Sequence, residues 1–210
     1  YETISINGSP VFEGMSRYEP NTLDARQNEW ISPIIQSLTH LNTPYLRKAR
    51  LMGQRAMKAL GMGTGFTHME WFLTSQGEVI FGEIACRSPG ANMVDLMNFA
   101  GDIALYSAWG QAVIHGGIRQ LNPKERSAAI VFKRAAGVGC IQRITGLRTF
   151  IQKYRPHIAR LDLLPVGTRR RDWRQTFLSD GNIVVRHDDP DKTLAMAREA
   201  ARDIQLYASP

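Results

Sequence analysis

The chain has 210 residues and a net charge of +7, with 43% hydrophobic and 21% charged residues. This composition is typical of a globular protein that buries a core without disulfides, and it excludes disordered, collagen-like and low-complexity classes. Two cysteines, Cys86 and Cys140, are too few for a disulfide framework or a cysteine-rich zinc site. No apolar run approaches the roughly 20 residues that cross a bilayer, so we expect a cytoplasmic protein without a membrane anchor.

The first predicted elements are a hairpin and a long helix. Residues 1–6 and 11–15 are strand-like and flank Asn7-Gly8, a dipeptide typical of a two-residue hairpin turn. Residues 16–43 are polar, and we expect them to be irregular. Thr43-Pro44 then predicts a helix start, with Thr as N-cap and Pro at the first helical position.

A second hairpin and two helices follow. Residues 68–73 and 79–85 alternate between apolar and polar positions, so they predict two antiparallel strands that turn near Gln76-Gly77. Residues 93–99 and 102–114 have helical periodicity. We found no internal repeat.

The charge is uneven along the chain. Residues 1–118 carry 8 basic and 10 acidic residues, whereas residues 119–210 carry 18 basic and 9 acidic residues. We therefore place a domain boundary at 118/119. A basic half indicates either an anionic partner or a solvated basic face, and charge alone does not separate the two.

The second half predicts a smaller α+β domain. Its expected strands are residues 128–132 and 140–144, and its expected helices are residues 147–154 and 192–206. His187-Asp188-Asp189 could be mistaken for a metal cluster. Because Pro190 and a helix follow, these residues more simply predict a helix N-terminus.

Two glutamates carry the most specific functional signal. With the hairpin turn near Gln76-Gly77, Glu70 and Glu83 face each other on neighbouring strands, roughly 5 Å apart. Like charges placed opposite each other destabilise a sheet unless a cation lies between them, and Mg²⁺ or Mn²⁺ suits such oxygen ligands. The alternative is that both glutamates are solvent-facing, or that one of them pairs with Arg87.

The hairpin resembles the ATP-grasp superfamily. The resemblance lies in His68-Met69-Glu70, then Gly77, then the run from Glu83 to Gly90 that reads EIACRSPG. It implies an α+β fold, namely the C-terminal lobe of an ATP-grasp domain (an antiparallel sheet with helices), followed by a small α+β domain. Within the superfamily, the turn after Arg87 is most similar to that of L-amino-acid ligases.

The resemblance implies a function and a set of site residues. The expected reaction is amide-bond formation from a carboxylate and an amine, through an acyl-phosphate made with ATP and Mg²⁺ or Mn²⁺. It assigns Glu70 and Glu83 to the metal and ATP phosphates, and Arg87 to catalysis and substrate. It places the other site residues around them, with Phe72 at the adenine and three residues, His68, Gly90 and Asn92, near the substrate.

Two features depart from the superfamily. The family's third metal ligand is usually an Asn two residues after the second Glu, and this chain has Ala85 there, which leaves open whether one or two ions bind. No phosphate-covering loop is recognisable, so we expect the chain to be the C-terminal portion of a longer ligase. Its partners would be a small carboxylate, an amine and the N-terminal lobes of the same protein, and the exposed face of such a fragment could self-associate.

Two alternative functions stay open. A carboxylase-like member of the superfamily would phosphorylate a different carboxylate. In a different class, the basic half would bind nucleic acid or another polyanion, with the run from Arg169 to Arg174 contacting phosphates around Trp173. We favour an exposed connecting loop for that run, which makes a nucleic-acid partner the weaker prediction.

Overall fold

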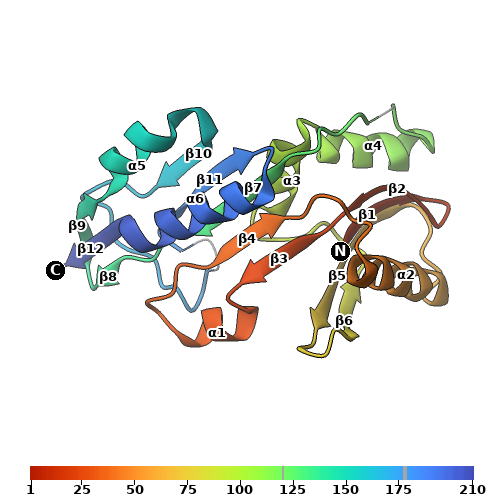
Figure 1. Cartoon of the computed structure of the whole chain (residues 1–210), viewed down its shortest axis with the longest axis horizontal. Helices are drawn as coiled ribbons and strands as arrows, with labels where there is room; N and C mark the ends of the chain where they lie inside the picture. The colour runs from red at the N-terminus through yellow and green to blue at the C-terminus, as the bar shows by residue number, and fades with distance from the viewer. Residues whose placement is uncertain (120, 177–178) are drawn as a thin grey trace. The chain divides into compact units, whose positions relative to one another are not determined.

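The computed structural model describes residues 1–119, 121–176 and 179–210. They fold into two compact units, the first made of Tyr1–Ser16 with Leu38–Glu125 and the second of Arg17–Ser37 with Arg126–Pro210 (Figure 1). The second unit therefore includes residues 17–37, which the predicted division at 118/119 assigned to the first domain. Each unit combines helices with an antiparallel sheet, so the α+β prediction is confirmed.

A four-stranded antiparallel sheet in the order β2-β1-β5-β6 forms the centre of the first unit. Both predicted hairpins are present in it. The elements of this unit are β1 (Glu2–Ile6), β2 (Ser9–Gly14), α2 (Pro44–Ala59), β5 (Gly65–Leu73), β6 (Val79–Ala85), α3 (Met93–Gly101) and α4 (Leu105–His115).

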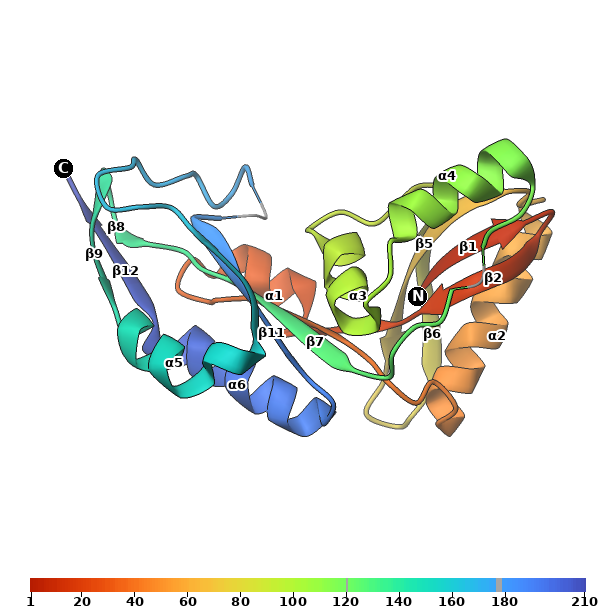
Figure 2. The same ribbon diagram turned by 90° about the horizontal axis from the view of Figure 1, so that it is seen from above.

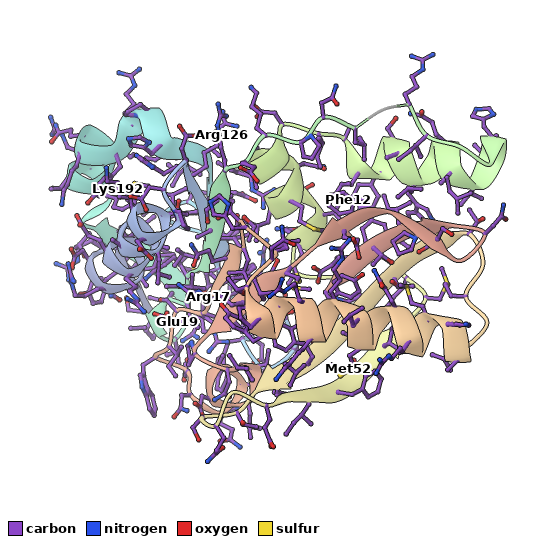
Figure 3. All side chains as sticks on the ribbon, turned by 45° about the vertical axis from the view of Figure 1, so that its right-hand side comes forward. Phe12, Arg17, Glu19, Met52, Arg126 and Lys192 are labelled. Atoms are coloured by element: carbon purple, nitrogen blue, oxygen red, sulfur yellow. The ribbon has the colours of Figure 1, made fainter. Side chains whose placement is uncertain are left out.

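The two faces of this sheet carry different helices (Figure 2). On one face Ile4 and Phe66 pack against α3 and α4, and Phe12 of β2 joins this cluster. On the other face Met69 packs against α2, whose Met52, labelled in Figure 3, contributes to the cluster. The β5–β6 hairpin is held on this face along its length, since Trp71, Val79 and Ile84 also pack against the α2 cluster.

A glycine in the middle of α2 allows that packing to be close. Gly53 is buried, and a Cβ at this position would lie 2.5 Å from the ring of Tyr1. Burial raises the pKa of the Tyr1 phenol, and a hydrogen bond to Glu13 raises it further. The helix thus accepts a residue of low helical propensity because the neighbouring ring needs the space.

The second unit contains a five-stranded sheet in the order β10-β11-β7-β4-β3 and a three-stranded sheet in the order β8-β12-β9. Its elements are β3 (Ser16–Glu19), α1 (Thr22–Gln27), β4 (Ile34–Ser37), β7 (Ser127–Phe132), β8 (Ala136–Gly137), β9 (Cys140–Thr145), α5 (Leu147–Tyr154), a 3-10 turn (Arg155–His157), β10 (Ile158–Leu163), β11 (Gly181–His187), α6 (Pro190–Asp203) and β12 (Gln205–Ser209).

Helix α6 lies along β7, β11 and β4, and its buried residues join the core of this unit (Figure 1). Glu19 of β3, labelled in Figure 3, accepts two hydrogen bonds of 2.7 Å from Arg198 of the helix. In the last turn of the helix, the fully buried Lys133 donates to the carbonyl of Ala201 at 2.7 Å, and it also donates to the hydroxyl of Ser32 at 2.8 Å. The ammonium thereby binds a carbonyl of the last helical turn, which also accepts from Nε2 of Gln205 at 3.5 Å.

Two sequence-based expectations were wrong. Residues 16–43 are not irregular: they contain β3, α1 and β4, because β4 pairs with β7 and buries Ile34–Ser37 completely. The last helix does not reach Leu206. It ends at Asp203, and the residues after it form β12, which pairs with β8 and β9.

The predicted helix N-terminus near residue 190 is confirmed. Asp189 is the N-cap of α6, and its carboxylate accepts from the amides of Asp191 at 2.8 Å and Lys192 at 3.2 Å. The hydrogen bond from Lys192 is the main cause that lowers the pKa of Asp189. None of the helices in the described ranges has both the length and the apolar composition that crossing a bilayer requires.

Candidate functional site

The β5–β6 hairpin places the two glutamates as the sequence predicted. Glu70 and Glu83 are direct partners in the antiparallel ladder, as are His68 and Ala85. The register shifts between Glu70 and Trp71, so β6 has a bulge at this point. Gly82 accommodates the bulge, since a Cβ there would lie 2.8 Å from the carbonyl oxygen of Glu70.

The glutamate pair has the chemistry of a hard-cation site. The side chain of Glu70 is 33% exposed and Glu83 is exposed, so both carboxylates can reach a ligand in solvent. Two directly opposed carboxylates repel each other unless a cation lies between them. Within the described residues no three His, Cys, Asp or Glu side chains already form a group that could hold a metal ion, so the backbone register is the observation that brings the two glutamates together. Oxygen donors of this kind fit Mg²⁺ or Mn²⁺.

His68 lies beside this pair and is buried, with 5% of its surface exposed. Its Nδ1 is 3.1 Å from Oε1 of Glu2, and its Nε2 is 3.7 Å from Oε1 of Glu70. The ring therefore lies between a buried carboxylate of β1 and a carboxylate of the candidate site. The expected role of His68 near the substrate stays a prediction, because the contacts it makes are with these two side chains.

Sequence reasoning missed Glu2. This residue is 1% exposed and pairs across the strands with His68, and it lies on the face of β1 that also carries Ile4. A charged residue in the apolar register of a strand is the signal that could have found it, because such a charge needs a buried partner.

The loop from β6 to α3 carries the remaining polar candidates. Arg87 is exposed, and its Nη1 donates to the carbonyl of Ser88 at 3.0 Å. Gly90 is exposed, and a Cβ there would meet open space, so close packing within this chain does not explain the glycine. Asn92 is the N-cap of α3, and its backbone is left-handed, with a φ of 55°. The structure places these residues directly after the strand of Glu83, and their substrate contacts stay predictions.

An apolar tip continues the hairpin beyond the glutamates. Phe72 is 53% exposed, and its ladder partner Ile80 is 48% exposed. An exposed aromatic ring two residues from Glu70 is compatible with the predicted stacking on adenine. Cys86, directly after β6, is also exposed.

The basic run in the second unit is tied into the fold. Arg170 pairs with Glu29 at 2.6 Å, and Arg171 donates to the carbonyl of Ser179 at 2.9 Å. The guanidinium groups of Arg134 and Arg174 each lie 4.9 Å from the ring of Trp173. The run thus follows a loop, as we favoured, and several of its cations make contacts inside the unit.

A separate hollow of about 220 Å³ lies in the second unit. Its lining includes Arg126 (labelled in Figure 3), Arg186, His157, His187 and Asp188. Arg126 is paired with Asp188 at 3.0 Å, and the two imidazole rings are 4.9 Å apart. None of the predicted site residues lies in this hollow.

Comparisons with known proteins give structural matches alone. No protein-family model matches the chain, and no curated protein matches its sequence. The chain is similar in structure to the L-amino acid ligase of Bacillus licheniformis, with a TM-score of 0.70 at 19% identity over 99% of this chain and 51% of that one. It is also similar to the phosphoribosylglycinamide synthetase of Anaerococcus prevotii, with a TM-score of 0.69 at 12% identity over 99% of this chain and 52% of that one.

A third structure has the same architecture. The N5-carboxyaminoimidazole ribonucleotide synthetase of Thermotoga maritima has a TM-score of 0.62 at 20% identity over 85% of this chain and 47% of that one. The chain thus spans about half the length of these enzymes. At such low identity the matches establish the fold, and they agree with the motif around Glu70 and Glu83. The chain has the fold of an ATP-grasp ligase, over about half the length of those enzymes.

Proposed function

We propose that this chain is the metal- and nucleotide-binding part of an ATP-dependent carboxylate–amine ligase. The observation that carries the proposal is the direct pairing of Glu70 with Glu83 across β5 and β6, in a chain with the ATP-grasp fold. The similarity to the Bacillus licheniformis L-amino acid ligase supports an amino acid as the carboxylate substrate. The activity of the whole enzyme would also need the part of an ATP-grasp protein that this chain does not span.

In the proposed reaction, an oxygen of the carboxylate attacks the γ-phosphorus of ATP, the bond between this phosphorus and the β,γ-bridging oxygen breaks, and ADP leaves. The resulting acyl-phosphate is then attacked by an amine, which forms the amide and releases phosphate. Such a transfer requires alignment and charge neutralisation rather than a protein nucleophile. A divalent ion, when bound, supplies Lewis-acid neutralisation of phosphate oxygens.

Each predicted residue has a defined task in that reaction. Glu70 and Glu83 would hold the ion, with one carboxylate from each strand. Arg87 neutralises the oxygens of the transferred phosphoryl group, since a guanidinium can donate two parallel hydrogen bonds to an oxyanion. Phe72 stacks on the adenine, and the loop around Gly90 and Asn92 approaches the substrate carboxylate.

Calorimetric titration with Mg²⁺ and a non-hydrolysable ATP analogue tests the proposal. We expect Glu83→Gln to weaken binding by at least about tenfold, because the amide keeps the shape of the side chain and removes its charge. Glu78→Gln is the matched control, since Glu78 is an exposed glutamate of the same hairpin. Equal binding by the Glu83 and Glu78 variants would contradict the proposal.

A carboxylase-like reaction is the second candidate. The chain is also similar to a biotin carboxylase complex with an ATP analogue from Campylobacter jejuni, with a TM-score of 0.54 at 13% identity over 82% of this chain and 39% of that one. Both candidates share the metal and nucleotide chemistry at Glu70 and Glu83. They differ in the substrate: release of ADP with an amino-acid pair supports the ligase, whereas release with bicarbonate supports the carboxylase.

A further inference from the structure

The ring of His68 occupies a defined position next to the glutamate pair. His68 is the ladder partner of Ala85, just as Glu70 is the ladder partner of Glu83. His68 and Glu70 are two residues apart on one strand, so both side chains lie on the same face of the sheet. The face that presents the glutamates therefore has an imidazole at the position opposite Ala85, whose side chain has no donor atom.

Glu2 determines the orientation of this ring. The Nδ1 atom of His68 lies 3.1 Å from Oε1 of Glu2, and the Glu2 side chain is 1% exposed. The other oxygen, Oε2, is buried and has no hydrogen-bond partner among the residues that the structure describes. A buried carboxylate next to Nδ1 favours the tautomer with the proton on Nδ1, which leaves a lone pair on Nε2.

The Nε2 atom of His68 lies beside the carboxylate of Glu70. Nε2 and Oε1 of Glu70 are 3.7 Å apart, which exceeds a hydrogen bond. Two electron-rich atoms that face each other in this way need a proton or a cation between them. Two ligands of one ion, each about 2.1 Å from it, lie at most about 4.2 Å apart, so the observed separation suits a shared metal ion.

We propose that His68 is a metal ligand, which binds the divalent ion of the Glu70/Glu83 pair through Nε2, and that Glu2 is its positioning residue. This inference rests on the proposed function and deepens it, since it replaces the missing oxygen donor at Ala85 with a nitrogen donor. A carboxylate that accepts from the distal nitrogen of a ligating histidine is a common arrangement in metal sites. The nitrogen shifts the preference of the site from Mg²⁺ toward Mn²⁺ and later transition metals.

Pulsed electron paramagnetic resonance of bound Mn²⁺ tests the ligand directly. Tripolyphosphate replaces the nucleotide, so that no nitrogen of adenine contributes to the spectrum. We expect the unmodified chain to show ¹⁴N coupling from a directly bound imidazole, and His68→Asn to lose this coupling. His115→Asn, at an exposed histidine of α4, should keep it.

Calorimetry on the same variants measures the effect on affinity. We expect His68→Asn to weaken Mn²⁺ binding by at least about tenfold. We expect Glu2→Gln to weaken it by about 10- to 100-fold while the ¹⁴N coupling persists. Thermal unfolding of each variant identifies loss of fold. If His68→Asn does not fold, His68→Gln with the same readouts takes its place.

A rescue variant distinguishes a ligand from a structural histidine. In a His68→Asn background, Ala85→Asn supplies the oxygen donor, so we expect Mg²⁺ binding to be restored without ¹⁴N coupling. Mn²⁺ binding that lacks ¹⁴N coupling in the unmodified chain, and that Glu83→Gln abolishes, would overturn the role of His68 and leave the proposed function intact. Mn²⁺ binding that neither the Glu83 nor the His68 variant changes would overturn both.

Discussion

Single buried charges show how much individual residues depend on their surroundings. Lys133 directly follows β7 and is fully buried against the last turn of α6. Burial lowers the pKa of its ammonium to about 8, from an ordinary value of 10.5. Glu2 is equally buried, yet it faces an imidazole. The first charge closes a helix end, and the second orients a candidate ligand, so burial alone does not distinguish a structural group from a functional one.

The lowered pKa of Lys133 predicts a pH dependence of stability. Between about pH 8 and pH 10 the unfolded chain binds a proton at this amine more often than the folded chain does, so this residue makes stability rise with pH. We expect Lys133→Met to remove the rise, because the variant has no amine to titrate. Urea unfolding at about pH 7 and about pH 9.5 measures the change.

Lys48→Met, at an exposed lysine of α2, is the control and should leave the pH dependence unchanged. A rise of the same size in the Lys133→Met variant would show that other groups cause it.

At the scale of elements, the register of the β5–β6 hairpin is determined by nearby sequence. The sequence of α2, in contrast, is adapted to the ring of Tyr1 that packs against it. The turn at Gln76-Gly77 and the alternation of the strands sufficed to predict that Glu70 and Glu83 are partners. The bulge at Gly82 of β6 did not follow from alternation, because it depends on backbone contacts with β5. Gly53 of α2 likewise has no local explanation in a helix, and only the ring of Tyr1 accounts for it.

Gly53→Ala should therefore destabilise the chain in spite of the higher helical propensity of alanine. The added methyl group would lie 2.5 Å from a buried ring, and we expect overpacking to cost about 1–3 kcal/mol. Chemical denaturation measures the loss.

Gly110→Ala in α4 is the matched control, since a Cβ there would meet no atom within 4 Å. We expect this substitution to stabilise the chain by about 0.4–1 kcal/mol. If both glycine variants gain stability, the close contact with Tyr1 does not limit α2.

At the scale of the whole molecule, some of the basic residues that make the charge uneven form contacts inside the second unit. Residues 119–210 hold all of the excess of basic residues, since residues 1–118 have more acidic than basic residues. Arg170 and Arg198 each form an ion pair inside the second unit, and Lys133 and Arg134 are buried. These contacts favour a structural use of much of the basic charge over a nucleic-acid surface.

We therefore expect only weak, salt-sensitive binding to nucleic acid. Fluorescence anisotropy with duplex and single-stranded DNA should give dissociation constants no tighter than the roughly 10⁻⁶–10⁻⁴ M of non-specific contacts at physiological salt. Tight binding that Glu83→Gln leaves unchanged would favour the polyanion-binding alternative over the ligase.

The sequence by itself determined the features that depend on neighbours along the chain. A short turn and a period of two define a hairpin register, so the pairing of Glu70 with Glu83 could be predicted without a structure. The capped start of α6 at Asp189 was predictable for the same reason. The resemblance of the hairpin motif then pointed to the ATP-grasp fold that the structure has.

Only the tertiary structure decided which distant segments meet. Glu2 and His68 are 66 positions apart, and β4 joins the second unit through pairing with β7, far from it in sequence. Such pairings depend on the path of the whole chain and on which apolar faces bury each other, and local patterns carry little of that information. The placement of β1 beside β5 brings Glu2 to the ring of His68, which is the residue that we propose as a third metal ligand.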